Sequence, residues 1–242
     1  MISIIIPTYQ HGYTILKTLE SIFNQTFQDF EVIIVNDGST DNTKEVLSSY
    51  IAKLSKNDQE RIKVINQERK GAAAARNRGF QESKGDFLFF CDADVVLRKD
   101  CLEKMFKTLK ENPEASYAYS SFKFGWKVFP SFDFDPERLK KMPYISCMSL
   151  IRRQHFPGFD ESLTKFQDWD LWLTMLEDGH RGVYIPEILF SVKPRKIGLS
   201  TWLPTFFYKI PWHIFPFKFF KPKTIQKYEE ATRIIKEKHK LK

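Results

Sequence analysis

Short apolar runs alternate with amphipathic segments over the first hundred residues. The runs are rich in β-branched residues and end at Pro, Gly, Asn or Asp, which is typical of buried strands. The segments between them repeat apolar residues every three or four positions, which is typical of helices. The pattern predicts strands at residues 2–6, 31–35, 61–65 and 86–91, and helices at residues 13–23, about 40–51 and 71–82. This alternation predicts an α/β fold with a mostly parallel sheet and right-handed crossovers.

The pattern is less regular after residue 98. It predicts helices at residues 99–109 and 168–176, and strands at residues 116–124, 144–151 and 182–185. Residues 224–242 are predicted to form a basic helix, with one apolar stripe made of Ile225, Tyr228, Ala231 and Ile235. No apolar stretch reaches the roughly 20 residues that a membrane-spanning helix needs.

Positive charge is concentrated near the C-terminus. The 242 residues carry a formal net charge of +8, and 42% of them are hydrophobic, which is enough for a core. Residues 193–242 contain 13 Lys or Arg and 3 Asp or Glu, so the preceding residues are close to neutral. Such asymmetry favours an anionic partner, either a membrane or a nucleic acid. The three cysteines fit neither a zinc site nor a disulfide framework, and the N-terminus lacks the pattern of a signal peptide; both points favour a cytosolic protein.

Two carboxylates follow the strand predicted at residues 86–91. Asp92 and Asp94 are alternate residues at the end of an apolar run, so they can face one crevice. Ligands bind at strand ends in α/β sheets, and a divalent cation relieves the repulsion between two carboxylates. The alternative is a solvated turn with two acidic residues.

Six motifs, taken in their order and spacing, resemble family 2 glycosyltransferases of the GT-A fold. They are residues 5–9 (Ile-Ile-Pro-Thr-Tyr), 35–41 (Val-Asn-Asp-Gly-Ser-Thr-Asp), 71–79 (Gly-Ala-Ala-Ala-Ala-Arg-Asn-Arg-Gly), 92–94 (Asp-Ala-Asp), 157–161 (Pro-Gly-Phe-Asp-Glu) and 167–172 (Gln-Asp-Trp-Asp-Leu-Trp). The resemblance implies a GT-A domain at residues 1–200. Its Rossmann-like nucleotide-binding half would span about 1–98 and its mixed acceptor-binding half about 99–200, followed by a basic, aromatic-rich extension at 201–242.

The resemblance also implies a nucleotide-sugar donor, a UDP-sugar, bound at the strand ends. In the family, the residue matching Asp37 contacts uracil, the one matching Asp92 faces the ribose and sugar, and the one matching Asp94 holds the Mn²⁺ or Mg²⁺ that bridges the diphosphate. The nucleotide-binding residues expected here are Pro7, Thr8, Tyr9, Asp37, Lys70, Arg76, Asp92 and Ala93. Two alternatives remain open: residues 37–41 could be only a turn and helix cap, and Arg76 could brace the acidic strand ends as an ion pair.

Asp168 is the expected general base, which takes the proton of the incoming hydroxyl. Members of the family usually carry Glu-Asp here, whereas this chain has Gln167 before Asp168. Gln167 could bind an acceptor hydroxyl and Trp169 could stack on a sugar, while Trp172 is expected in the core. The alternative is that Asp168 only caps the following helix.

Lys193 and Arg195 are expected to contact the diphosphate, in the region where relatives often carry a basic or His-containing loop. No His is present here, which puts a third protein ligand to the metal in doubt. The alternative for both residues is a pair of solvated charges. The Gln-x-x-Arg-Trp motif of processive synthases is also absent, which favours transfer of a single sugar per encounter.

The extension beyond residue 201 lies outside the resemblance. Nine aromatic residues lie between Trp202 and Phe220, interrupted by prolines and interleaved with lysines. Aromatic rings and lysines together are typical of a membrane interface. The alternatives are that they cover the flank of the catalytic domain or the second subunit of a homodimer.

Taken together, the sequence predicts an inverting, metal-dependent transferase acting in cell-surface polysaccharide synthesis. It would move one sugar from a nucleotide-diphosphate sugar to a glycan or lipid-linked acceptor, at the cytoplasmic face of the membrane, with no nucleic-acid partner. Two alternatives are a nucleotidyltransferase acting on sugar phosphates, which would more typically have a Gly-rich loop after the first strand, and a non-catalytic nucleic-acid-binding or scaffold protein that uses the basic tail.

Overall fold

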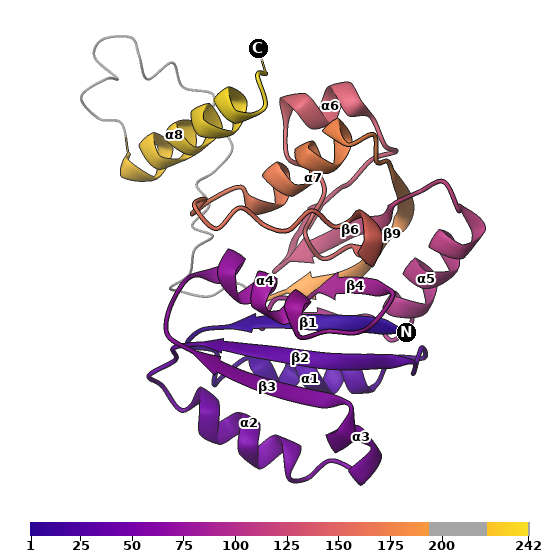
Figure 1. The fold of residues 1–242 in the computed structure, drawn as a ribbon, viewed down its shortest axis with the longest axis vertical. Coiled ribbons are helices and arrows are strands. Elements are labelled where there is room, and N and C mark those ends of the chain that lie inside the picture. Colours follow the sequence, from indigo (N-terminus) through magenta and orange to yellow (C-terminus); the bar gives the residue numbers. More distant parts are fainter. Residues whose placement is uncertain (194–221, 242) are drawn as a thin grey trace.

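A computed structural model describes residues 1–193 and 222–241, in which one mixed sheet is flanked by helices (Figure 1). Within these residues, nine strands form the sheet. They are β1 Ile2–Thr8, β2 Phe30–Asp37, β3 Ile62–Gln67, β4 Phe87–Phe90, β5 Val95–Leu97, β6 Tyr117–Phe124, β7 Lys127–Phe129, β8 Leu150–Arg152 and β9 Gly182–Val192.

The helices lie between these strands and at the C-terminal end. They are α1 Ile15–Phe23, α2 Thr43–Ile51, α3 Lys56–Glu60, α4 Ala72–Gln81, α5 Cys101–Glu111, α6 Pro136–Lys141, α7 Gln167–Glu177 and α8 Lys223–Lys238, with a short 3₁₀ turn at Arg153–His155. In the described parts of the chain, no helix combines the length and the apolar character needed to cross a membrane.

The sheet changes character at β4. Strands β3, β2, β1 and β4 are neighbours in this order and run parallel, as the alternation of strand and helix predicts. Beyond β4 the order continues through β8, β6, β9 and β5; β8 is antiparallel to β4 and β6, whereas β9 is parallel to β6. The expected fold class, with a mostly parallel first half and a mixed second half, is therefore confirmed.

Helix α4 packs closely on β1 and β2 because its residues are small. Ala73, Ala75 and Gly79 are buried, and a Cβ at Gly79 would lie 2.4 Å from Ile5 Cγ2. Real Cβ atoms do not approach a neighbour so closely, so the helix can occupy this position only with glycine there. This close packing holds the N-terminus of α4 beside the carboxyl ends of the parallel strands.

Two strand predictions in the second half are wrong in extent. The strand expected at residues 144–151 is present only as β8, since the carbonyls of Tyr144 and Ile145 accept hydrogen bonds from the side chains of Ser131 and Trp172 at 2.9 and 3.0 Å. The strand expected at residues 182–185 continues to Val192. Its pairing with β6 jumps from Ile185 to Ile188, and this irregularity bypasses Pro186, which cannot donate to the ladder.

Candidate active site

The predicted site residues gather at the carboxyl ends of the parallel strands. Asp37 is the last residue of β2, and Asp92 and Asp94 follow β4. Since β1 pairs in parallel with both strands, these three carboxylates lie at one edge of the sheet. Such edges bind ligands in open α/β sheets.

Asp37 fixes the loop that leads into α4. Its side chain is buried, and its two oxygens accept hydrogen bonds from the amides of Lys70 and Gly71 and from Gln67 Nε2, each at 2.8 Å. Gly71 has φ +101°, a conformation that glycine adopts without strain, and α4 begins at the next residue. The carboxylate that is expected to contact uracil therefore also holds the β3–α4 loop through hydrogen bonds.

The end of β1 differs from the expectation at Thr8. Thr8 is buried, and its hydroxyl donates to the carbonyl of Ile6 at 3.4 Å. Pro7 and Tyr9 are half-buried. The ring of Tyr9 lies under the guanidinium of Arg69, whose Cζ is 3.5 Å from the ring centroid, and this cation–π contact ties the β1 end to the β3–α4 loop.

Arg76 connects three elements at the site. The residue is 8% exposed; one terminal nitrogen of its guanidinium donates to Asp92 Oδ1 at 2.8 Å and the other to Gln167 Oε1 at 2.9 Å. The bracing role considered for Arg76 is therefore present, and it extends from the end of β4 to the start of α7. The Gln167 amide makes two hydrogen bonds. Its Oε1 accepts from Arg76, and its Nε2 donates to the carbonyl of Leu163 at 2.7 Å.

Asp168 lies beside this ion pair, in the first turn of α7. It is half-buried, and burial raises the pKa of its carboxyl, opposed by the amide of Trp169 and the positive charge of Arg76, while the negative charge of Asp92 adds to the rise. Asp168 Oδ1 accepts from the Trp169 amide at 2.9 Å. The residue at the N-cap position is Phe166, so Asp168 does not occupy the cap position that the structural alternative requires.

Trp169 does not take the position expected of a sugar-stacking residue. Its ring is 2% exposed, and its indole N–H donates to the carbonyl of Leu139 at 2.7 Å. Trp172 is fully buried and donates to the carbonyl of Ile145, as expected of a core residue. Both indoles thus anchor α7 to the second half of the fold.

Asp94 faces a different set of neighbours from Asp92. It lines a small cavity with Lys17 and Thr18 of α1 and with Lys193, whose amide donates to the Asp94 carbonyl at 3.2 Å. The Lys193 side chain is exposed, and the neighbouring ammonium of Lys17 lowers its pKa. Ala93 between the two aspartates is buried, and Arg195 lies outside the described residues.

The donor set at this edge fits a cation that is shared with a substrate. Asp94 is partly exposed and offers carboxylate oxygen, which Mg²⁺ and Mn²⁺ prefer, whereas Arg76 occupies one oxygen of Asp92. Residues 1–193 and 222–241 contain no group of three His, Cys, Asp or Glu side chains that could enclose a metal. The arrangement therefore suits an ion held by one carboxylate and by ligand phosphates, and not a closed protein cage.

Some residues at the site carry no signal in the sequence pattern. In the sequence, Lys17 looks like an ordinary solvated position on the polar face of α1 and Arg69 like a charged loop residue, because both meet the site only through tertiary packing.

Asn77 binds the loop of the Pro157–Glu161 motif: its side chain exchanges two hydrogen bonds of 2.8 Å with the backbone of Phe159. The order of the motifs along the chain is the signal that could have linked Asn77 to this loop.

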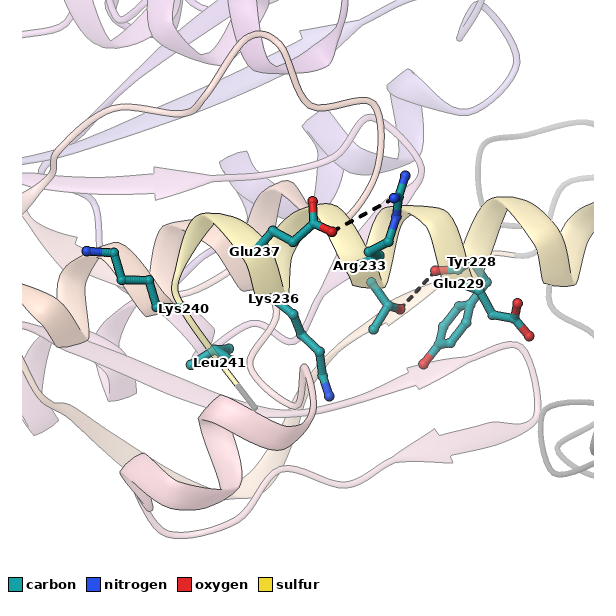
Figure 2. Close-up of a pocket in the computed structure, with 8 residues that line it drawn as sticks. Tyr228, Glu229, Arg233, Lys236, Glu237, Lys240 and Leu241 are labelled. Atoms are coloured by element: carbon teal, nitrogen blue, oxygen red, sulfur yellow. Dashed lines mark hydrogen bonds and ion pairs between the residues drawn. The ribbon is translucent and has the colours of Figure 1, made fainter. Parts of the chain in front are cut away.

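A second cavity, of about 560 Å³, lies along α8 (Figure 2). Its lining residues all belong to α8 or to the residues that follow, and Arg233 and Glu237 form an ion pair in its wall. None of the residues predicted to bind a donor, acceptor or metal lines this cavity.

Solved structures share this fold. TarS of S. aureus in complex with UDP-GlcNAc superposes with a TM-score of 0.70 at 22% identity, over 86% of this chain and 63% of that one. The mannosyltransferase PcManGT from Pyrobaculum calidifontis in complex with GDP-Man and Mn²⁺ gives a TM-score of 0.65 at 20% identity, over 82% of this chain and 58% of that one. Together with the mixed sheet, these similarities identify the GT-A fold.

Sequence relatives carry the comparison further. The putative teichuronic acid biosynthesis glycosyltransferase TuaG of Bacillus subtilis is 30% identical over 214 residues, which are 84% of this chain and 83% of the relative. The glycosyltransferase GlyG of Streptococcus pneumoniae is 33% identical over 112 residues, or 46% of this chain. The matched regions cover only 26–36% of the length of GlyG and of three further relatives.

The family assignment rests on the pattern along the whole site. The model of the family described as "Glycosyl transferase family 2" matches residues 3–160, a span that holds the β1, β2 and β4 strand ends and α4. TuaG extends the similarity beyond that span and through most of the chain. The chain therefore belongs to glycosyl transferase family 2.

Proposed function

We propose that this protein is an inverting glycosyltransferase that moves one sugar from a UDP-sugar to a glycan or lipid-linked acceptor in cell-surface polysaccharide synthesis. The observation that carries the proposal is the position of Asp168. A half-buried carboxylate stands next to the Arg76–Asp92 ion pair, where the end of β4 meets the start of α7. In the described residues, α4, the segment after β4 and α7 each supply one member of this group.

Asp168 would act as the general base. Burial raises its pKa, which makes it a stronger base than a solvated Asp, and the charge of Arg76 opposes that rise. With its proton acceptor on one face of the sugar and the diphosphate leaving from the other, a single displacement inverts the anomeric centre. The ion pair and Gln167 hold the start of α7 and so fix the base against the strand ends.

Asp94 would hold a Mn²⁺ or Mg²⁺ ion through its carboxylate. When bound, such an ion neutralises negative charge on the diphosphate. Lys193 is exposed beside Asp94 and offers a second positive charge to the same phosphates, and Lys17 lines the same cavity. We extend the diphosphate role to Arg195 on sequence grounds alone.

The relatives support the choice of donor and acceptor classes. Structures of TarS contain UDP and UDP-GlcNAc, which favours a uridine diphosphate donor here, whereas the GDP-Man complex of PcManGT makes a guanosine donor the main competitor. The names of TuaG and of the chondroitin synthase of Pasteurella multocida support a polysaccharide acceptor. Membership of the family gives no support to a nucleotidyltransferase or a nucleic-acid-binding scaffold.

A peripheral position at the inner face of the cell membrane completes the proposal. Its support is the basic charge and the aromatic residues of the sequence at 201–242, most of which lies outside the described residues. A second subunit is the competing partner for the same aromatic residues.

A donor panel tests the function. The full chain is incubated with UDP-GlcNAc, UDP-glucose, UDP-galactose and GDP-mannose, with and without Mn²⁺, and scored by thermal shift and by slow hydrolysis of the donor. We expect at least one UDP-sugar to bind and be hydrolysed only with the metal. Stabilisation by GDP-mannose alone would reject the uridine donor, and the absence of hydrolysis of every nucleotide sugar would reject the transferase.

A further inference from the structure

The end of α8 contacts the helix that carries Asp168. α8 lies beside α7 (Figure 1), and its last residues, Lys238 and the following His239, reach Asp170. Lys238 Nζ lies 2.7 Å from Asp170 Oδ1 and 2.7 Å from Asp160 Oδ2. His239 Nε2 lies 2.8 Å from Asp170 Oδ1, and its Nδ1 lies 2.8 Å from Glu177 Oε1.

These contacts are buried where they meet Asp170. The side chains of His239 and Asp170 are 2% and 4% exposed. Within the described residues, the hydrogen bonds and ion pairs of the Asp170 carboxylate are all made to Lys238 and His239. A buried carboxylate that loses its partners must gain water or move, so without α8 the first turn of α7 could not keep this position.

A second contact reaches Phe166, two positions before the base. Phe166 has φ +57°, which is unusual for a bulky residue, and it directly precedes Gln167 and Asp168. Its ring packs edge-on against Tyr228 of α8, with centroids 5.3 Å apart, and against Trp169 at 5.6 Å. α8 thus contacts α7 both before and after Asp168.

We infer that α8 is part of the catalytic apparatus, in which Lys238, His239 and Tyr228 are positioning residues that hold α7 so that Asp168 faces the strand ends. The inference rests on the proposed role of Asp168 as the base. It gives the C-terminal helix a function separate from membrane binding, because Lys238 and His239 contact Asp170 of α7 and Tyr228 contacts Phe166 at the start of that helix.

His239 adds a pH dependence to this contact. Burial lowers its pKa, but the carboxylates of Asp170 and Glu177 outweigh burial and hold the pKa above the ordinary value of 6.5. The other charged groups facing it are Lys238 and Asp160. The protonated ring donates to both carboxylates and the neutral ring to only one, so the contact is complete below pH 6.5 and weakens as the pH rises through the raised pKa.

Full-length variants separate positioning from folding. Lys238→Met removes the charge that pairs with Asp170, Lys238→Arg keeps it, and His239→Gln replaces the titrating ring with a neutral side chain. Lys227→Met is the matched control, since it removes one charge from an exposed position of the same helix. UDP calorimetry measures donor binding, and turnover of the donor that the panel selects measures catalysis.

We expect UDP affinity to stay within about twofold and kcat to fall by about 10- to 100-fold in Lys238→Met, the size of effect that a small misplacement of a catalytic group produces. Lys238→Arg, which keeps the charge, should recover part of the kcat that Lys238→Met loses, and Lys227→Met should keep the wild-type kcat. The wild-type rate should decline as the pH rises through the raised pKa of His239, and this decline should be absent in His239→Gln.

Wild-type kcat in folded Lys238→Met, or the same decline with rising pH in His239→Gln as in the wild type, overturns the inference. If Lys238→Met does not fold, the double variant Asp170→Asn/Lys238→Met replaces it, because the buried carboxylate is then removed together with its lysine partner; the same loss of kcat is expected, and wild-type kcat overturns the inference. Hydrogen exchange of the α7 amides provides a readout that needs no substrate: exchange should be faster in Lys238→Met than in Lys227→Met, and equal exchange overturns the docking. A wild-type protein without any transfer activity rejects the proposed function instead.

Discussion

At the scale of single residues, the site depends on the two hydrogen bonds that the guanidinium of Arg76 donates. One guanidinium reaches both Asp92 and Gln167, so the carboxylate after β4 and the helix that carries Asp168 are fixed by the same side chain. Asp92 is 38% exposed, while Arg76 is almost wholly buried. A ligand can therefore reach Asp92, whereas Arg76 contacts the Asp92 carboxylate from the buried side.

Replacing Asp168 with Asn should separate binding from catalysis. The amide cannot accept the proton of the acceptor hydroxyl, so turnover should fall by a factor of about 10² to 10⁴ with donor affinity unchanged. Since burial disfavours the charged form of Asp168, the variant should be at least as stable as the wild type near neutral pH. Single-turnover kinetics and thermal melting check both expectations, and near-normal kcat would show that Asp168 is not the base.

The wild-type enzyme should also lose activity in acid as Asp168 becomes protonated. Its folded-state pKa lies above the ordinary 3.8, so the acid limb of the kcat profile should lie above that value. The base is active above this pKa and inactive below it, which gives a rate that rises with pH across the limb.

Asp94→Asn should abolish the effect of a divalent metal on UDP binding. The amide keeps the shape of the side chain but loses the charge that attracts a divalent cation. We expect UDP to bind the variant equally with and without Mn²⁺, in contrast to the wild type, as measured by calorimetry. The control is Asp100→Asn, which lies outside the strand-end crevice and pairs with Arg98; a Mn²⁺ effect on UDP affinity that survives in folded Asp94→Asn argues against Asp94 as the ligand.

At the scale of elements, the approach of α4 to β1 sets where the site lies. Helix N-termini favour anions, and α4 begins at the loop fixed by Asp37, so its distance from the sheet decides where a phosphate could meet it. At Gly79 the helix lies so close to β1 that a Cβ would be 2.4 Å from Ile5 Cγ2.

Gly79→Ala should therefore destabilise the protein although alanine favours helices. The new methyl group would overlap Ile5 Cγ2, and overpacking of this kind costs about 1–3 kcal/mol. Urea unfolding measures the loss. In the double variant with Ile5→Ala the two costs should not add, since truncation of Ile5 makes room for the methyl group; additive costs would mean that the helix adjusts elsewhere.

The sequence pattern predicted a helix or strand correctly where the residues of that segment alone determine its structure. The apolar runs of β1, β2 and β4 and the Ala-rich α4 are recognisable without the fold. Tyr144, Ile145, Cys147 and Met148, in contrast, are apolar and buried yet form no strand. Helix α6 was missed although Asp135 before Pro136 is a typical start signal, and the Asp135 carboxylate accepts from the amides of Glu137 and Arg138.

At the scale of the whole molecule, two separate roles are proposed for the C-terminal region. α8 is docked on α7 through Asp170, while the sequence at 201–221 is predicted to contact anionic membranes. A truncation near Ser200 would remove both together, so it cannot test the membrane alone.

Point substitutions in the full chain make that test. Replacing Trp202, Phe206 and Phe207 with Ser removes apolar groups while the charge of the tail stays the same. We expect wild-type protein to float with anionic liposomes, less so in high salt, at roughly 1 kcal/mol per Lys near the surface, and the variant to float less. The control is UDP binding, which should not change; equal flotation of both proteins, or of neither, rejects these aromatic residues as membrane anchors.

The sequence by itself determined the family, the alternation of strands and helices, and the positions of Asp92, Asp94 and Asp168, because each depends on residue type and local spacing. Only the tertiary structure decided which of these side chains meet. It placed Arg76 between Asp92 and Gln167, buried Thr8 and Trp169, and brought Lys238 and His239 to Asp170 across about 70 residues of chain. Contacts at that separation depend on the packing of whole elements, and a local pattern of residues does not encode them.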